Sequence, residues 1–208
     1  NRNNALGGGC LDEDSGLTDF GRRVVARMND VGMVICCSHT GERTARQVID
    51  SSAHPVIFSH SNARSVYDHP RNISDEMIKA CAASGGVVGL NGLGVFLGPG
   101  GGILDQLVAH IDYVASLVGP EHVGLGLDYV FDLSELDDYL AASPEFFPAD
   151  AVLGGLQEMV THSHLTKLAE ALLAKAWPEQ AIAGLFGANH LRVARAVWNK
   201  GSCQQQTP

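Results

Sequence analysis

Two short apolar runs in this sequence end in the same Ser-His pair. The runs cover residues 33–37 and 55–58, and the paired histidines are His39 and His60. Each run is short and rich in Val and Ile, which is typical of a buried parallel strand. In folds built from such strands, functional groups gather where the strands leave the core. The sequence therefore predicts two histidines at equivalent strand ends.

The spacing of the two histidines indicates a shared site. They are 21 residues apart, about the length of one strand-helix unit. Neighbouring strands lie about 5 Å apart, so the imidazoles of His39 and His60 can converge on one ion. A single histidine beside a strand is more often a hydrogen-bonded structural residue, and it is the repeated context that favours a metal site.

Strands and helices alternate along the first part of the chain. Strands are predicted at 33–37, 55–58, 86–91 and 123–128, and helices at 17–31, 41–52, 74–84 and 104–118. This alternation, at intervals of roughly 20 to 35 residues, predicts right-handed βαβ units and an α/β fold with a parallel sheet. Further helices are expected at 132–143 and, with breaks at Pro178 and Gly187, over 163–199.

Composition narrows the class of function. The 208 residues carry a formal net charge of −9 with no basic run, so binding to nucleic acid is not expected. No apolar run reaches about 18 residues. The five cysteines lack a disulfide-framework spacing and are interpreted as buried free thiols. Location stays open on these grounds, with a reducing, cytoplasmic compartment favoured by the thiols.

An acidic residue, Asp128, stands where the fourth predicted strand ends. A carboxylate near a metal-bound water can carry its proton during hydrolysis, so Asp128 is a candidate catalytic residue. The alternative is a helix cap or a loop hydrogen bond. Arg71 follows a proline in a predicted loop and would, on this ground alone, be a solvated loop residue.

Four blocks of the sequence together resemble the membrane (renal-type) dipeptidases and their bacterial relatives. They are Ser38-His39, residues 55–61, His69-Pro70-Arg71-Asn72 and residues 124–128, in this order and at these separations. The resemblance runs from Asn1 to about Trp198. It implies a TIM-like (β/α)8 metallohydrolase barrel of the amidohydrolase superfamily. Residues 1–199 would supply about strands 5–8 plus the carboxyl-terminal helices, and residues 200–208 form a polar tail.

The resemblance also implies roles for individual residues. His39 and His60 match ligands of one zinc of a binuclear Zn²⁺ pair. Arg71 matches the residue that binds the carboxylate of the substrate, and a planar guanidinium suits that task. Asp128 matches the acid that takes a proton from the attacking water and delivers one to the leaving amine. The implied activity is zinc-dependent hydrolysis of dipeptides by a metal-bridging hydroxide.

The chain departs from the family in one large respect. The family's His-x-Asp pair, a metal-bridging Glu and a further site His come from the amino half of the barrel, which has no counterpart here. Four strands cannot close a barrel. We therefore expect the missing amino-terminal half to be a partner that completes the site, with a homodimer as a second candidate assembly.

Two other interpretations stay open. The chain could be a non-catalytic, truncated or degenerate dipeptidase-like protein, or a barrel amidohydrolase acting on another small amide or ester. Zinc content separates the first from the dipeptidase, which needs two zinc ions per complete barrel. A substrate panel separates the second.

Overall fold

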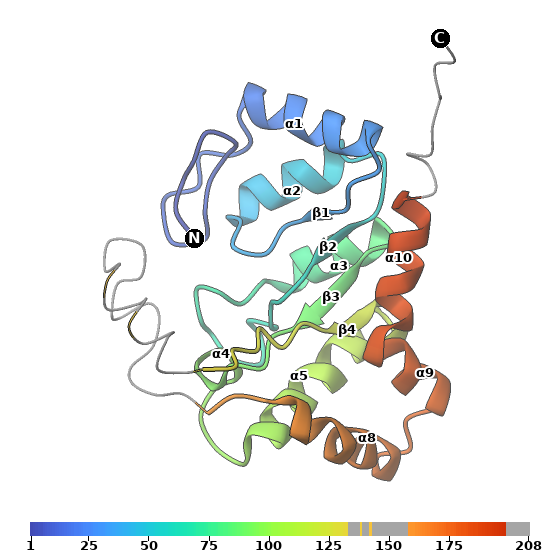
Figure 1. Ribbon diagram of the computed structural model, residues 1–208. Helices are drawn as coiled ribbons and strands as arrows, with labels where there is room; N and C mark the ends of the chain where they lie inside the picture. The colour runs from blue at the N-terminus through green and yellow to red at the C-terminus, as the bar shows by residue number, and fades with distance from the viewer. Residues whose placement is uncertain (133–137, 139–141, 143–157, 199–208) are drawn as a thin grey trace.

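One parallel sheet organises the chain (Figure 1). The computed structural model describes residues 1–132, 138, 142 and 158–198. Its strands are β1 (Ile35–Cys36), β2 (Val56–Phe58), β3 (Val87–Leu90) and β4 (Val123–Leu125). They lie in the order β1-β2-β3-β4, and each pairs in parallel with the next strand along the chain. The predicted α/β fold with a parallel sheet is confirmed.

Helices connect the strands and follow the last of them. Helix α1 (Asp19–Asp30) precedes β1. Between the strands lie α2 (Glu42–Ser51), α3 (Asp75–Ala83), α4 (Gly94–Leu97), α5 (Ile103–Val118) and the 3-10 turn η1 (Pro120–His122). After β4 come η2 (His162–His164), α8 (Leu165–Ala174), α9 (Glu179–Ala183), η3 (Gly184–Ala188) and α10 (Asn189–Trp198).

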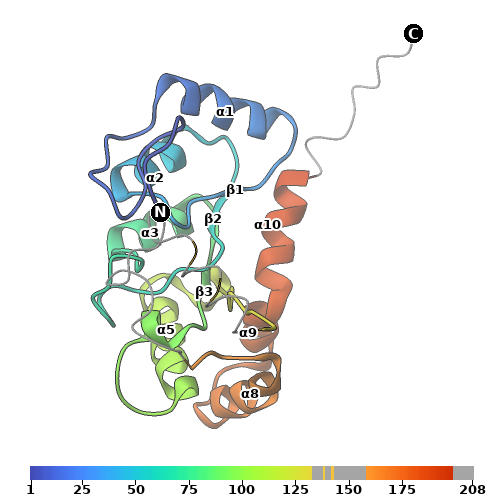
Figure 2. The same cartoon turned by 60° about the vertical axis from the view of Figure 1, so that its left-hand side comes forward.

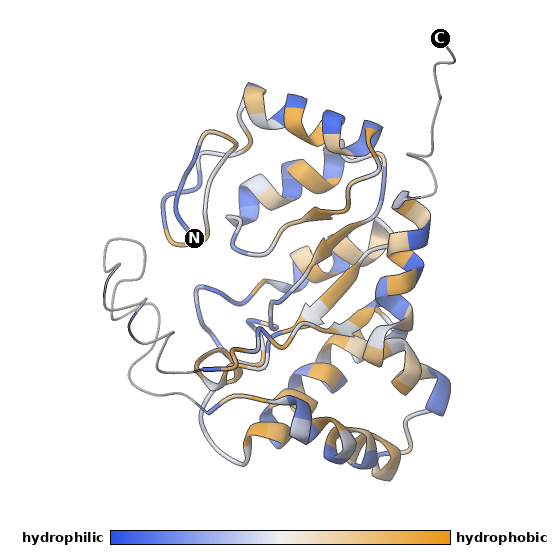
Figure 3. Cartoon of the chain, in the orientation of Figure 1, coloured by the Kyte–Doolittle hydropathy of each residue, from blue (hydrophilic) through white to orange (hydrophobic). Residues whose placement is uncertain are grey.

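Local sequence explains where two of these helices begin. The Thr18 side chain accepts a hydrogen bond from the Gly21 amide at the start of α1, and Ser74 accepts one from Met77 at the start of α3. Such caps satisfy backbone N–H groups that have no partner inside the helix. Polar and apolar residues alternate around α1 and α2, so each buries one face (Figure 3).

The sheet is covered on both faces. Helices α3 and α5 lie on one side of it and α10 on the other (Figure 2). Val88 belongs to the main core, whereas Val87 packs with Val193 and Val197 of α10. Successive strand residues point to opposite faces, which is why these adjacent valines enter different clusters.

The structure corrects several details of the predicted elements. The strands are shorter than expected, β1 having two residues and β4 ending at Leu125, three residues before Asp128. Helix α4 was not predicted. The breaks at Pro178 and Gly187 are confirmed, since Pro178 precedes α9 and Gly187 has a non-helical φ of 150°. The expected helix at 132–143 and the tail at 200–208 lie largely or wholly outside the described residues.

Strand β1 forms one edge of the sheet, since within the described residues it pairs only with β2. Met33, two residues before β1, is 53% exposed. Cys37 and Cys81 are buried free thiols as predicted, but Cys36 is exposed. No helix in the described ranges is long and apolar enough to cross a membrane.

Candidate metal and substrate site

The two predicted histidines meet beyond the carboxyl ends of β1 and β2. The Nε2 atoms of His39 and His60 lie 2.7 Å apart, and their ring centroids are separated by 4.8 Å at an interplanar angle of 60°. The convergence predicted from the repeated Ser-His pattern is therefore confirmed.

The serine of each Ser-His pair helps to position the imidazoles. The Ser38 hydroxyl accepts a hydrogen bond from the backbone N–H of His60 at 3.1 Å and is also 3.1 Å from the Ser61 hydroxyl. The Ser59 hydroxyl lies 2.7 Å from Nδ1 of His60. These contacts tie the ends of the two strands together and fix the ring of His60.

An amide oxygen orients the other imidazole. Oδ1 of Asn1 accepts a hydrogen bond from Nδ1–H of His39 at 2.6 Å. An amide oxygen can only accept, so this contact assigns the proton of a neutral His39 ring to Nδ1. The Nε2 lone pair is then left facing His60, which is the arrangement found in metal-binding histidines whose second nitrogen is held by an outer partner.

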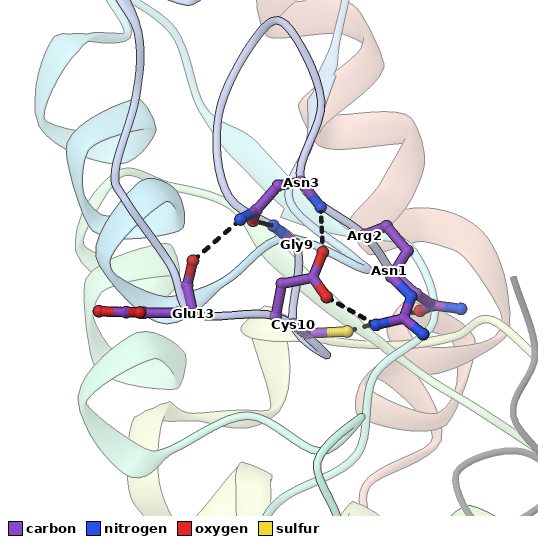
Figure 4. Close-up of polar contacts among 7 residues, drawn as sticks. Asn1, Arg2, Asn3, Gly9, Cys10 and Glu13 are labelled. Atoms are coloured by element: carbon purple, nitrogen blue, oxygen red, sulfur yellow. Dashed lines mark hydrogen bonds and ion pairs between the residues drawn. The ribbon is translucent and has the colours of Figure 1, made fainter. Parts of the chain in front are cut away.

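The loop that carries Asn1 is held by its own polar contacts (Figure 4). Asn3 accepts a hydrogen bond from the Gly9 amide at 2.9 Å and donates one to the Glu13 carbonyl at 3.0 Å. Arg2 forms an ion pair with Asp12 at 2.7 Å. These contacts hold the loop, and the loop delivers an amide oxygen to the site.

The environment keeps both imidazoles neutral. Burial lowers the pKa of His39 to about 3, and the nearby Arg71 guanidinium and His60 add to the shift. Burial also lowers the pKa of His60, with the Asp128 carboxylate acting in the opposite direction and Arg71 in the same one. Neutral rings retain the lone pairs that bind metal ions at neutral pH.

Arg71 is a buried cation at the centre of the site, with an exposed fraction of 6%. Its Nη2 lies 3.0 Å from Nε2 of His39, its Nη1 lies 3.8 Å from the Cys10 sulfur, and the Phe96 ring centroid is 5.4 Å from its Cζ. No carboxylate in the described part of the chain forms an ion pair with it. Its place after a proline in a predicted loop had, by itself, indicated a solvated arginine, but in the structure Arg71 is buried.

Asp128 follows β4 and is exposed. Its Oδ2 accepts a hydrogen bond from the Asn91 amide at 3.1 Å, and its charge acts on His60. The alternative to a catalytic role was that Asp128 caps a helix or forms a loop hydrogen bond. It caps no helix among the described elements, but it does form a loop hydrogen bond, to Asn91.

Two site residues have an unusual backbone. His39 has φ 66° and Asp128 has φ 57°, and Ala176 is the third non-glycine residue with positive φ in the described chain. Few residues other than glycine adopt this region, although asparagine, aspartate and histidine do so more often than the rest. Such strain tends to gather at functional sites, where the surrounding structure holds it.

A cavity of about 190 Å³ opens beside the site. His39, Arg71 and Cys10 line it, and so do the acidic residues Asp12, Asp14 and Glu42. His60 and Asp128 lie outside this lining. The structure thus places Arg71 in contact with His39 and His39 in contact with His60, while Asp128 approaches the pair from the side of β4.

The facing imidazoles of His39 and His60 are suited to a metal ion. Two facing imidazoles fit one zinc ion, but a shared tetrahedral ion would hold their Nε2 atoms about 3.4 Å apart, so the rings must separate slightly. Within residues 1–132 and 158–198 no group of three His, Cys, Asp or Glu side chains is placed to hold a metal. Protein zinc sites use three or four protein ligands, so a zinc ion here would need further ligands besides these two imidazoles.

Other histidines have structural contacts. His110 is fully buried, with Nδ1 accepting from the Ala63 amide at 3.2 Å and Nε2 lying 3.2 Å from the Leu97 carbonyl. His69 accepts from the Arg71 backbone amide at 3.1 Å through Nδ1. No contact with a second histidine is found for either among the described residues, but Asp68 precedes His69 and its charge acts on that ring.

Sequence reasoning missed three asparagines of the site: Asn1, Asn62 and Asn91. Asn62 and Asn91 have exposed fractions of 0% and 1%. Asparagine is common in loops, so nothing in its type indicates burial. The signal that could have found Asn91 is its place as the last, polar residue of the apolar strand predicted at 86–91, comparable to the strand-end positions of His39 and His60.

Comparisons with known proteins agree with one another. Residues 1–142 match the family described as membrane dipeptidase (peptidase family M19). Dipeptidase 3 of Rattus norvegicus is 34% identical over 184 residues, covering 88% of this chain and 34% of the rat protein. An uncharacterized dipeptidase of Schizosaccharomyces pombe is 33% identical over 199 residues, covering 94% and 44%. The chain thus spans less than half the length of these curated relatives.

Solved structures give the same picture. An amidohydrolase from Pseudomonas aeruginosa superposes with a TM-score of 0.87 at 34% identity, covering 96% of this chain and 63% of that one. A metallopeptidase from Rhodobacter sphaeroides, solved with a phosphinate mimic of the dipeptide L-Ala-D-Ala, superposes with a TM-score of 0.69 at 25% identity. It is matched over 88% of this chain and 48% of its own.

Proposed function

The chain belongs to the membrane dipeptidase family, peptidase family M19, and from that premise we propose that it forms part of a zinc-dependent dipeptidase. Its residues would bind the carboxyl end of a dipeptide and supply two ligands of a binuclear zinc site. The family match and the dipeptide mimic bound to the Rhodobacter sphaeroides relative support this substrate class.

The observation that carries the proposal is the unpaired charge of Arg71. A guanidinium with an exposed fraction of 6% and no carboxylate partner among the described residues is costly to bury. An incoming carboxylate would neutralise it through two parallel hydrogen bonds. Every unmodified dipeptide carries such a carboxylate, and the cavity beside Arg71 offers room for it.

The metal part of the proposal rests on His39 and His60. Their neutral rings and facing Nε2 atoms are suited to a soft cation. Zinc, when bound, would lower the pKa of a bound water and polarise the peptide carbonyl. Nη2 of Arg71 lies on the lone-pair side of His39, so the guanidinium must turn toward the cavity when a cation takes its place.

Asp128 would move the proton. As a carboxylate it can accept a proton from the attacking water and then give it to the nitrogen of the leaving amine as the C–N bond breaks. The carboxylate is regenerated at the end of each turnover. Its exposure and its electrostatic action on His60 support a place beside the metal ligands.

Completion of the site requires further protein. The sheet has only four strands among the described residues, its β1 edge is unpaired, and only two metal-binding side chains meet. We propose that an amino-terminal half of the same barrel pairs with β1 and brings the remaining ligands. The exposed Met33, two residues before β1, supports the placement.

Substrates with and without a free carboxylate test the proposal. In a polypeptide that carries both halves of the barrel, Arg71→Ala should raise KM for dipeptides about 10- to 100-fold, the loss of a charge-assisted pair. Hydrolysis of the same dipeptides with an amidated carboxyl end should change little. The control is Arg46→Ala, which removes an exposed arginine paired with Asp50 on α2.

Three results would count against the dipeptidase. Equal losses for free and amidated dipeptides would remove Arg71 from carboxylate binding. A complete barrel that binds no zinc and cleaves nothing would favour the non-catalytic interpretation. Faster hydrolysis of other amides or of esters would favour a different amidohydrolase.

A further inference from the structure

The Asp128 carboxylate is held by one buried amide. Nδ2 of Asn91 donates to Oδ2 of Asp128 at 3.1 Å, and no other hydrogen bond to this carboxylate occurs among the described residues. Asn91 directly follows β3, and Asp128 lies three residues beyond the end of β4. The contact therefore joins segments that follow two neighbouring strands, β3 and β4. It lies at the carboxyl ends of the strands, where His39 and His60 also lie.

Asn91 is itself held on three sides. Oδ1 of Asn62 accepts from the Asn91 backbone N–H at 3.0 Å, and Nδ2 of Asn62 donates to the Asn91 carbonyl at 3.1 Å. Oδ1 of Asn91 accepts from the Leu93 amide at 2.7 Å. Because Oδ1 is taken up by an N–H donor, the NH2 group of Asn91 must face Asp128. The amide is a fixed donor.

Asp128 needs such a donor because little else restrains it. Its side chain is exposed, and its backbone, with φ 57°, is not part of the extended strand β4. A freely rotating carboxylate would spend much of its time away from the reacting atoms, and proton transfer requires a heavy-atom distance of about 2.6–3.2 Å. A buried hydrogen-bond donor removes that freedom before substrate arrives.

We propose that Asn91 is a positioning residue for the proton carrier, and that Asn62 fixes Asn91. This inference rests on the proposed function. With Oδ2 engaged by Asn91, Oδ1 of Asp128 is the oxygen that takes the proton of the attacking water and returns it to the leaving amine. Among the described residues Asn91 forms no hydrogen bond with His39 or His60, so it would act on the reaction only through Asp128.

The variant Asn91→Asp separates positioning from mere folding. An aspartate at 91 keeps the oxygen that accepts from the Leu93 amide and replaces only the NH2 group that faces Asp128. Two carboxylates then oppose each other. In the polypeptide that carries both barrel halves, we expect kcat for dipeptides to fall about 10- to 100-fold, with KM changed less than about threefold.

A double-mutant cycle tests whether Asn91 acts through Asp128. On an Asp128→Asn background, Asn91→Asp should lower kcat by less than about threefold more, because the partner that it positions is already lost. The loss caused by Asn91→Asp should also shrink for ester analogues, whose leaving group departs without protonation. Losses that simply multiply in the cycle would overturn the inference.

Asn189→Ala is the matched control. Asn189 has an exposed fraction of 8% and donates to the carbonyls of Pro120 and Val123, both at 2.8 Å, at the amino end of β4. Removing its side chain should lower the thermal unfolding midpoint about as much as removing that of Asn91. It should leave kcat unchanged, since its contacts lie at the opposite end of the strand from Asp128.

The NH2 signals of Asn91 in a ¹H–¹⁵N spectrum give a readout that needs neither metal nor turnover. Asp128→Asn should shift these signals and leave those of Asn189 in place. Signals that do not move would overturn the inference. If the unaltered protein hydrolyses no dipeptide, the proposed function fails while the spectrum still decides the contact; if it is active and Asn91→Asp retains its kcat, the inference alone fails.

Discussion

Nε2 of His39 lies 2.7 Å from Nε2 of His60, although the two residues come from different strands of the sheet. Two neutral imidazoles whose ring nitrogens face each other can share one proton or one cation. Each ring is held from its other nitrogen, His39 by Asn1 and His60 by Ser59. The pair is therefore oriented before any ion binds, which reduces the entropy lost on binding.

Removing one imidazole should remove metal. His39→Ala in the complete barrel is expected to lower zinc content by about one ion and to weaken zinc affinity by at least 10- to 100-fold, because one nitrogen ligand and its orientation are lost. Elemental analysis after dialysis measures this. His162→Ala, an exposed histidine, is the control. Unchanged zinc content in His39→Ala would exclude this residue as a ligand.

Asp128→Asn should affect turnover while leaving metal in place. An amide cannot accept the proton of the attacking water, so kcat is expected to fall by at least about 100-fold. Zinc content should match that of the unaltered protein, since Asp128 is not placed as a ligand. Full activity of the variant would remove Asp128 from the mechanism.

Gly126 should tolerate no side chain. A Cβ at this position would overlap the carbonyl oxygen of Ser59, the residue before His60. Gly126→Ala is expected to destabilise the protein by about 1–3 kcal/mol and to weaken zinc binding by displacing His60. Denaturant unfolding and zinc titration measure the two effects. Gly102→Ala, whose Cβ would meet only Asp105 at 3.6 Å, should change neither.

The free energy of unfolding of the metal-free protein should decrease as the pH is lowered. Burial lowers the pKa of His39 from its ordinary 6.5 to about 3, so the unfolded chain binds a proton at this residue where the folded chain does not. The contribution is fully present above about pH 7 and is lost progressively as pH falls toward 3. Urea midpoints at pH 7.5 and pH 5 measure the fall.

The variant His39→Gln provides the comparison for this pH dependence. Without the imidazole, the difference between the two midpoints should shrink. Burial also lowers the pKa of His60, His110 and His190, so part of the difference should persist. A difference that is unchanged in His39→Gln would argue against a neutral, buried His39.

The sequence predicted the features that follow from periodicity. Alternating apolar runs and helical faces are set by which residues must be buried, so the order of strands and helices and the meeting of His39 with His60 could be derived. Helix α4 could not be, because four residues are too few to display a helical period. The true end of β4 was hidden because Gly126 and Leu127 look like strand residues.

The polar part of the site was less accessible to sequence reasoning. The burial of Arg71 depends on contacts with Cys10 and Phe96, which are distant in the sequence. Asn62 and Asn91 interact across 29 residues, and hydrogen bonds of this range leave no periodic trace. Family resemblance supplied the expected role of Arg71 and added to that of Asp128, which its strand-end position had already indicated, whereas the asparagine contacts emerged only from the folded chain.

The left-handed backbone at His39 and Asp128 bears on how this protein can be improved in the laboratory. Glycine adopts positive φ at no steric cost, so a selection for heat resistance alone would favour glycine at both positions. Those two substitutions would delete a proposed zinc ligand and the proposed proton carrier. Substitutions at residues 39 and 128 that raise thermal stability would therefore be expected to lower turnover. A library of variants selected for stability should leave His39 and Asp128 unchanged.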